Sequence, residues 1–295
     1  LSPQATDWPV ADATNAVTFD KVTNAFEATF SEVTPKDDVS EQKDLLIGKA
    51  SGTENTSAAG LALTLNHVLS QIQIQAKHLN NAYTYHIKGV RIASVVGKGD
   101  YKFSAGWTVD TDRQTATLKT YDVILDQPIE LDGTAAGGNF AVLMKGNADN
   151  GYDNAMLIPQ QLIKWAGDKA HSGDTFDKGT YISLLLNVKT TNGGTYLYPS
   201  GAADDTQYGW AAIGIDTNWE AGKKYIYTLD ISNGCGKVDP VEPNEDPKNP
   251  IVKPQPDGKD PDKGEQIFGD PIKFDVTVTE WDNTFENTAD SDLEM

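Results

Sequence analysis

Apolar and polar residues alternate along much of the chain, and a period of two is typical of β-strands, whose successive side chains point to opposite faces of a sheet. The clearest case is residues 272–281, where Ile272, Phe274 and Val276 take even positions and polar side chains take the odd ones. Further segments that alternate or are rich in β-branched and aromatic residues predict strands at 83–96, 115–125, 140–144, 182–188 and 225–231. Helical periodicity is scarce, so the pattern indicates an all-β protein.

The segment 61–76 departs from strict alternation. Its apolar residues take odd positions through Leu69 and even positions from Ile72 to Ala76, so the phase changes near Ser70. A β-bulge produces such a change, and so does a strand that bends from one sheet into another at the edge of a sandwich. The sequence is compatible with both alternatives.

Turn residues separate the predicted strands, and Gly, Asn and Asp in these turns tolerate positive φ. They occur at residues 97–100, 132–133, 137–138, 192–194 and 232–234. The exception to the β pattern is residues 155–168, which predict a short helix after Pro159. Short strands punctuated by such turns are typical of β-sandwiches.

The length of 295 residues exceeds one typical domain and favours two domains of ~150 residues. We expect the boundary near residue 147, which gives an N-terminal β-sandwich domain, 1–147, and a C-terminal one, 148–295. Residues 237–266 contain seven of the chain's 14 prolines among charged residues, and they predict a long, extended and solvated loop inside the second domain. The strand at 272–281 follows, and residues 282–295 form a C-terminal tail.

Charge excludes several classes of partner. Acidic residues number 43 and basic residues 24, so the net charge of -19 disfavours attraction to nucleic acid or to an anionic membrane surface. Only Arg91 and Arg113 supply guanidinium groups, the usual bidentate readers of phosphate. No run of about 18 apolar residues is present, so we expect no membrane-spanning helix.

Candidate catalytic and metal-binding residues are few. The four histidines lack the spacing of common metal motifs, and one cysteine, Cys235, excludes an internal disulfide and a cysteine-rich metal site. Cys235 lies in a Ser-Asn-Gly-Cys-Gly turn that would expose a thiol, but no histidine lies nearby in the sequence to activate it. Phosphate-binding loops, nucleophile elbows and dinucleotide fingerprints are absent. We therefore predict no catalytic residue, no cofactor and no metal. The histidines are His67, His78, His86 and His171.

Four tryptophans have two interpretations. Exposed, they would form a platform on which sugars stack, whereas packing into the core is the commoner fate of such residues. They are Trp107, Trp165, Trp210 and Trp219.

The C-terminal tail has a pattern of its own. Its apolar residues all take odd positions, and its acidic residues take even positions, so an extended tail would have one partly apolar face and one acidic face. This is the pattern of a strand that adds to the open sheet edge of another molecule. The alternative is a solvated tail, because Asn283 and Asn287 dilute the apolar face. The candidate donor-strand face consists of Phe285, Ala289, Leu293 and Met295.

Four stretches together resemble a known family, the fimbrillin-like proteins of Bacteroidales, which are subunits of type V pili. They are Leu65–Ile72, Pro159–Gln160, Trp219–Leu229 and Ile272–Trp281, and their order and spacing cover most of the chain. Each stretch alone is a weak signal, because it is apolar alternation with one marker residue.

The resemblance implies two transthyretin-like β-sandwich domains in tandem, with Greek-key-type connections. It also implies a structural or accessory pilus subunit that is not an enzyme, with other pilus subunits as partners and a surface receptor as a further possible partner. Assembly would use strand exchange after proteolytic removal of an N-terminal strand. Attachment to the outer membrane would depend on a lipid anchor upstream of Leu1.

Two departures and two alternatives accompany this interpretation. The first arginine is Arg91, so an arginine-specific maturation protease has no N-terminal site, whereas lysines are available there. The proline-rich loop is longer than the family suggests. The first alternative is a non-polymerising surface lipoprotein that binds a glycan or a host protein, and the second is a hydrolase on a β-sandwich scaffold. The N-terminal lysines are Lys21, Lys36, Lys43 and Lys49.

Overall fold

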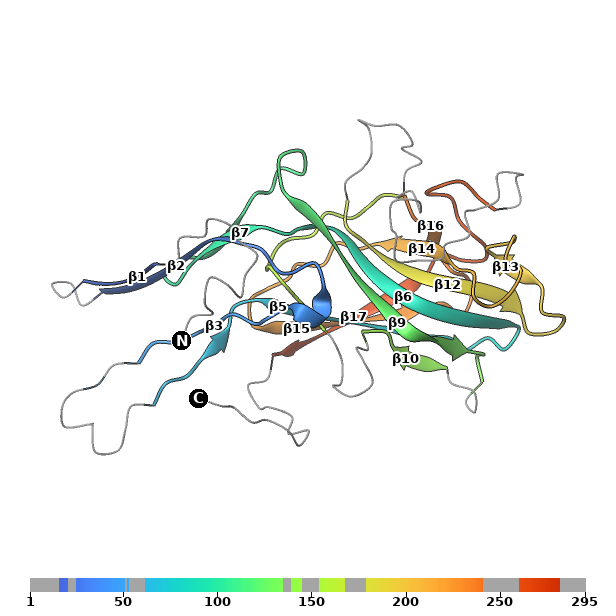
Figure 1. The fold of residues 1–295 in the computed structure, drawn as a ribbon, viewed down its shortest axis with the longest axis horizontal. Coiled ribbons are helices and arrows are strands. Elements are labelled where there is room, and N and C mark those ends of the chain that lie inside the picture. The colour runs from blue at the N-terminus through green and yellow to red at the C-terminus, as the bar shows by residue number, and fades with distance from the viewer. Residues whose placement is uncertain are drawn as a thin grey trace.

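All long elements in the described part of the chain are β-strands (Figure 1). Within the ranges that the computed structural model describes, the only helix is one 3₁₀ turn, η2 (Val39–Glu41), and none of them holds a helix able to cross a bilayer. The all-β prediction is confirmed. The described residues are 16–20, 25–50, 52, 62–134, 139–144, 154–167, 179–240 and 260–281.

The larger of the two main sheets has the strand order β16-β14-β12-β6-β9, with β13 paired to β12, and all of its pairs are antiparallel. Its central strand β12 is buried on both faces from Tyr181 to Val188. The strands are β6 (Tyr83–Val96), β9 (Leu118–Leu131), β12 (Tyr181–Thr190), β13 (Tyr196–Tyr198), β14 (Gly209–Gly214) and β16 (Lys237–Val238).

The second main sheet has the order β10-β5-β15-β17, and β11 also pairs with β5. The pairing of β5 with β15 is parallel, whereas the other pairs are antiparallel. The strands are β5 (Ser70–Lys77), β10 (Phe140–Val142), β11 (Ala155–Leu157), β15 (Lys223–Asp230) and β17 (Lys273–Glu280).

The two main sheets enclose one core, and we call this unit the sandwich. Alternate residues of each sheet point inward: Ile182, Leu184 and Leu186 from β12, and Ile72 and Ile74 from β5, are all fully buried in the same cluster. Burial of this apolar area, at ~25 cal/mol per Å², is the main stabilising contribution.

Strands from before and after residue 147 share both sheets of the sandwich. β6 pairs with β12 over ten residues, and β5 pairs with β15 over seven. The predicted boundary at 147/148 itself lies outside the described residues. The division into domains 1–147 and 148–295 stays a prediction.

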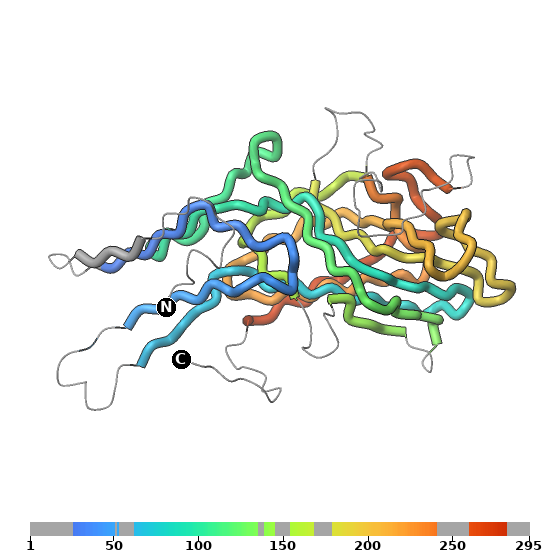
Figure 2. The backbone as a smooth tube through the Cα atoms, viewed as in Figure 1, coloured from blue at the N-terminus to red at the C-terminus, as the bar shows by residue number. Residues whose placement is uncertain are grey.

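A smaller unit, which we call the N-terminal lobe, extends from one end of the sandwich (Figures 1 and 2). Its four-stranded sheet has the order β1-β2-β7-β8, and β3 pairs with β4 in a separate two-stranded sheet. A second core lies here, with Phe30, Leu45 and Tyr101 among its buried residues. The strands are β1 (Ala16–Asp20), β2 (Ala25–Val33), β3 (Leu46–Ile47), β4 (Asn66–His67), β7 (Gly99–Lys102) and β8 (Gly106–Val109).

The phase change near Ser70 marks the passage from the lobe to the sandwich. β4 ends at His67, Val68 and Leu69 are buried in the core of the lobe, and Ile72 is buried in the core of the sandwich. The chain therefore leaves one sheet and enters another, which confirms the second of the two alternatives for this segment.

The helix predicted for residues 155–168 is wrong. Ala155–Leu157 is strand β11, paired to β5, and the described residues that follow, 158–167, contain no helix. Pro159 disfavours the helical conformation at Ile158. The side chain of Gln160 accepts a hydrogen bond from the Val96 amide at 2.8 Å and donates one to the Val96 carbonyl at 2.9 Å, so tertiary contacts outweigh local preference.

The proline-rich segment 237–266 is folded at both ends. Val238 exchanges hydrogen bonds with the backbone of Gly264 and Glu265, and Asp239 and Asp260 are buried. The expectation of a solvated loop is therefore wrong for these ends, because their backbone extends the large sheet. Residues 241–259 lie outside the described residues.

Candidate functional site

The last strand, β17, forms one edge of the sandwich. All eight of its residues pair with β15, from Lys273 opposite Asp230 to Glu280 opposite Lys223. No described strand pairs with its other edge. An unprotected edge of this length can accept hydrogen bonds from, and donate them to, another extended chain.

The apolar face of β17 becomes progressively more exposed along the strand. Ile272, just before it, is 4% exposed, Phe274 and Val276 are partly buried, and Val278 is 50% exposed. The short strand β16 of the large sheet pairs with Ala211 and Ala212 of β14, and Lys237 of β16 also bridges to Gln266, a few residues before β17. The start of β17 is therefore covered by the core, while its end offers apolar surface.

The N-terminal lobe has an edge of a different kind. β1 pairs with β2 alone, from Ala16 opposite Thr29 to Asp20 opposite Ala25. Because β1 is the first described strand and has one neighbour, it can leave without breaking any other pair of the described strands. The next segment, β2 to β3, contributes the lobe's buried residues Ala28, Phe30, Val33, Leu45 and Ile47, which are five of the nine in its core.

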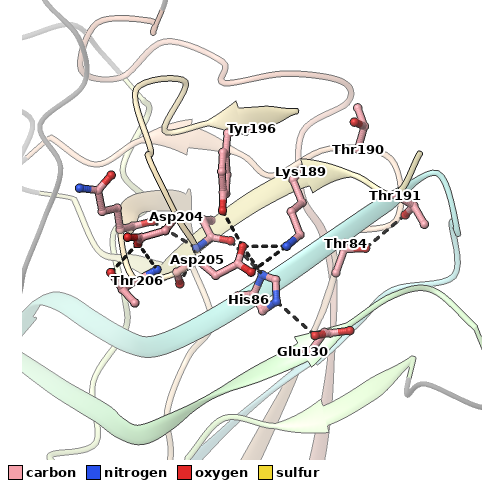
Figure 3. Close-up of polar contacts among 12 residues, drawn as sticks. Thr84, His86, Glu130, Lys189, Thr190, Thr191, Tyr196, Asp204, Asp205 and Thr206 are labelled. Carbon is pink, nitrogen blue, oxygen red and sulfur yellow. Dashed lines mark hydrogen bonds and ion pairs between the residues drawn. The ribbon is translucent and has the colours of Figure 1, made fainter. Parts of the chain in front are cut away.

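A cluster of polar side chains lies on the outer face of the large sheet, where it converges on Asp205 (Figure 3). Lys189 of β12 donates to both carboxylate oxygens of Asp205 at 2.8 Å, and the hydroxyl of Tyr196 donates to one of them at 2.7 Å. Burial opposes ionisation of Asp205, but these hydrogen bonds outweigh it and lower the pKa of this carboxyl. Burial and the hydrogen bond to Asp205 raise the pKa of Tyr196 to about 12.

His86 of β6 connects this cluster to β9 (Figure 3). Its Nδ1 lies 3.0 Å from Oδ1 of Asn187 and 3.7 Å from Asp205, and its Nε2 lies 3.2 Å from Glu130. The amide of Asn187 donates to the carbonyl oxygens of Asp205 and Gln207. The cluster therefore fastens the loop that contains Asp205 to the sheet, which is a structural role.

Two further histidines are also held by protein groups. His67 pairs with Asp44, and His78, which is fully buried, lies 3.0 Å from the carbonyl of Tyr83. In the described part of the chain, no group of three His, Cys, Asp or Glu side chains could hold a metal. His171 lies outside it.

The prediction of an exposed thiol at Cys235 is wrong. The side chain is fully buried in the core of the sandwich, and burial raises the pKa of the thiol well above its ordinary value. Gly234 bridges to Gly269, and Gly236 has a φ of 88°, so the turn folds back against residues 268–270. This contact, 35 residues distant in the chain, cannot be read from the turn sequence.

Three of the four tryptophans are buried in the protein interior. Trp165, Trp210 and Trp219 are at most 4% exposed, so these residues do not form a sugar-stacking platform. Trp107 is partly buried, and its indole N–H donates to the carbonyl of Val68 at 2.5 Å.

The predicted donor-strand face lies outside the described residues, which end at Trp281. Its location relative to the edges of the sheets therefore stays untested. Sequence reasoning missed the cluster around Asp205 and His86, because strands β6, β9 and β12 and the loop that contains Asp205 come together only in the folded chain. The sequence did contain one signal of this cluster: His86 of β6, and Asn187 and Lys189 of β12, are polar residues at outward positions of two interior strands of the sheet. The predicted donor-strand face, in the tail, consists of Phe285, Ala289, Leu293 and Met295.

Comparison with known proteins gives a family match. The model of a family described as fimbrillin-like matches residues 9–244. None of the curated proteins with which the sequence was compared matches it.

Solved structures from Bacteroidales species are also similar. A candidate cell adhesion protein from Parabacteroides distasonis is 12% identical, with a TM-score of 0.39, over 94% of this chain and 79% of its own. Another, from Bacteroides uniformis, is 13% identical, with a TM-score of 0.33, over 93% of this chain and 68% of its own.

Proposed function

The chain belongs to the fimbrillin-like family, a family of surface proteins related to pili and adhesion and not known for enzymatic activity, and from this premise we propose that it is a structural or accessory pilus subunit. Subunits join when the C-terminal tail of one occupies the place of an N-terminal strand in the next. Its partners are other pilus subunits, and it supports adhesion at the cell surface. Attachment to the outer membrane through a lipid anchor is part of the same proposal.

The observation that carries this proposal is the composition of the lobe's core. Five of its nine buried residues come from the first 47 residues of the chain, and the other four come from Val68 onward. Removal of the N-terminal segment would uncover the second set while the sandwich keeps its own core. The vacated surface is apolar and lies beside a sheet edge, which are the two requirements for strand addition.

The donor is the tail itself. Phe285, Ala289, Leu293 and Met295 fall on one face of an extended chain, and such a face can replace the apolar side chains that β2 and β3 contribute. The acidic residues fall on the other face, where water solvates them.

The experiment uses protein that ends at Trp281 and a synthetic peptide of residues 282–295, with the protein either intact or trimmed of residues 1–49. We expect the peptide to raise the melting temperature of the trimmed protein only, because the site must first be vacated. A peptide with Phe285→Asp and Leu293→Asp should have no effect, and the matched control with Asp290→Asn, on the acidic face, should act as the natural peptide does.

Two results would contradict the proposal in different ways. No rise in either form rejects the tail as a donor. An equal rise in both forms means that the peptide binds an edge that is already open, for which β17 is the candidate, and rejects the vacated site.

A further inference from the structure

The end of β17 is held by contacts with segments that are distant in the chain. The backbone N–H of Trp281 donates to the carbonyl of Gly222 at 2.8 Å, and Gly222 in turn donates to Leu69 at 2.9 Å. The indole of Trp281 stacks on the imidazole of His67, with ring centroids 4.0 Å apart and planes inclined by 9°. Parallel stacking at this distance fixes both the position and the tilt of the indole.

The ring on which Trp281 stacks is itself positioned by the N-terminal segment. Nδ1 of His67 forms a hydrogen-bonded pair with the carboxylate of Asp44, and both side chains are largely buried. Next to this pair, Leu46 pairs with His67 in the β3–β4 ladder, and the amide of Val68 donates to the carbonyl of Leu45 at 3.1 Å. Residues 44–47 therefore fix both the backbone and the side chain of His67.

Trp281 also rests on the apolar core of the lobe. Most buried residues of that core come from β2 and from the segment around β3, such as Phe30, Leu45 and Ile47. The N-terminal segment thus supports Trp281 twice, once through the orientation of His67 and once through the surface on which the indole lies.

We propose that Asp44, His67 and Trp281 form a latch through which the N-terminal segment holds the end of β17 in place. Loss of residues up to Ile47 removes the partner of His67 and most of the apolar support of Trp281, and it leaves the hydrogen bond to Gly222. The end of β17 then loosens, together with Trp281. One event at the N-terminus would thus free the root of the tail, an inference that rests on the proposed function for its biological meaning.

The test measures amide hydrogen exchange in the full chain, in peptides that cover residues 276–281. We expect Asp44→Asn and His67→Ala to accelerate exchange there by roughly threefold to tenfold, the effect of losing one aromatic or charged contact. The beginning of β17 and all of β12 should keep their protection. His86→Ala is the matched control, since it removes a second buried histidine with carboxylate neighbours from the opposite end of the molecule and should leave residues 276–281 unchanged.

A conservative variant separates stacking from the link to the N-terminus. His67→Phe keeps a ring beneath Trp281 and loses the pair with Asp44, so its exchange should lie between those of the natural protein and His67→Ala. Unchanged exchange in both Asp44→Asn and His67→Phe would overturn the latch, even if His67→Ala accelerates exchange, because the N-terminal segment would then have no control over Trp281. These measurements use the monomer without peptide, so their outcome does not depend on whether the tail binds another subunit.

Discussion

The sandwich and the N-terminal lobe both bury apolar side chains between β-strands, but their cores are built from different parts of the chain. The sandwich joins strands from both parts of the chain, and its central strand β12 is buried on both faces. The lobe depends on two short sheets and on a core to which the first 47 residues contribute most of the buried side chains. Under the proposed function, the sandwich keeps its own core throughout, whereas the lobe is the part in which one contributor to the core is replaced.

The two edges of the molecule differ in the same sense. Both are edge strands with a single neighbour, but β17 pairs with β15 over eight residues, whereas β1 pairs with β2 over five. Under the proposed function, exchange at β1 would replace a strand, while pairing at β17 would add one. Experiments that separate the two regions test this distinction.

A cavity in the sandwich should destabilise the whole protein, whereas a similar cavity in the lobe should destabilise the lobe alone. Leu184→Ala in the sandwich should lower the free energy of unfolding of the whole protein by ~2–5 kcal/mol, and Phe30→Ala should cost the lobe ~3–5 kcal/mol, since both side chains are buried. Urea denaturation measures the first effect. Amide exchange measures the second, which should appear in β2 and β7 while β12 keeps its protection. If Phe30→Ala accelerates exchange in β12 by the same factor, the two regions unfold as one unit.

The gradient of exposure along β17 predicts a second difference. Ile272→Ala should lower the free energy of unfolding by ~2–4 kcal/mol because that side chain is 4% exposed and lies in the core. Val278→Ala, at a site that is 50% exposed, should change it by less than ~0.5 kcal/mol. The comparison is made by measuring the urea midpoints of unfolding of the two variants, provided that their m-values are equal. A cost at Val278 similar to that at Ile272 would mean that another part of the chain covers this end of the strand.

The smallest expected effect concerns pH and the cluster at Asp205. Because the folded-state pKa of this carboxyl lies below its unfolded value of about 3.9, its pairing stabilises the protein above that pH and the contribution is lost as pH falls through the folded-state pKa. The difference in stability between the natural protein and Asp205→Asn should stay below ~1 kcal/mol, since the carboxylate is partly exposed, and should shrink below pH ~4. Urea titrations at several pH values measure it, and amide exchange of β2 serves as the control. A difference that grows on acidification would reverse the assigned sign.

Much of the fold could be read from local pattern. Four predicted strands lie inside observed ones or extend past them by at most one residue at an end, because alternation is a property of the strand's own residues. They are 83–96, 182–188, 225–231 and 272–281. The prediction for 155–168 failed because Gln160 and β5 supply partners that no local window contains. The prediction of an exposed thiol at Cys235 failed for the same reason, because residues 268–270, which are distant in the sequence, cover its turn.

The amino-acid pattern alone was enough to predict that this chain forms strands, where most of them lie, and that the alternation changes phase near Ser70. Only the three-dimensional structure shows that β5 lies parallel to β15, which no local pattern predicts, and that Trp281 stacks on His67, which in turn pairs with Asp44. The difference arises from the range of the interactions: alternation reflects the two faces of a single strand, whereas the pairing of β5 with β15 and the stacking of Trp281 on His67 join residues more than a hundred positions apart.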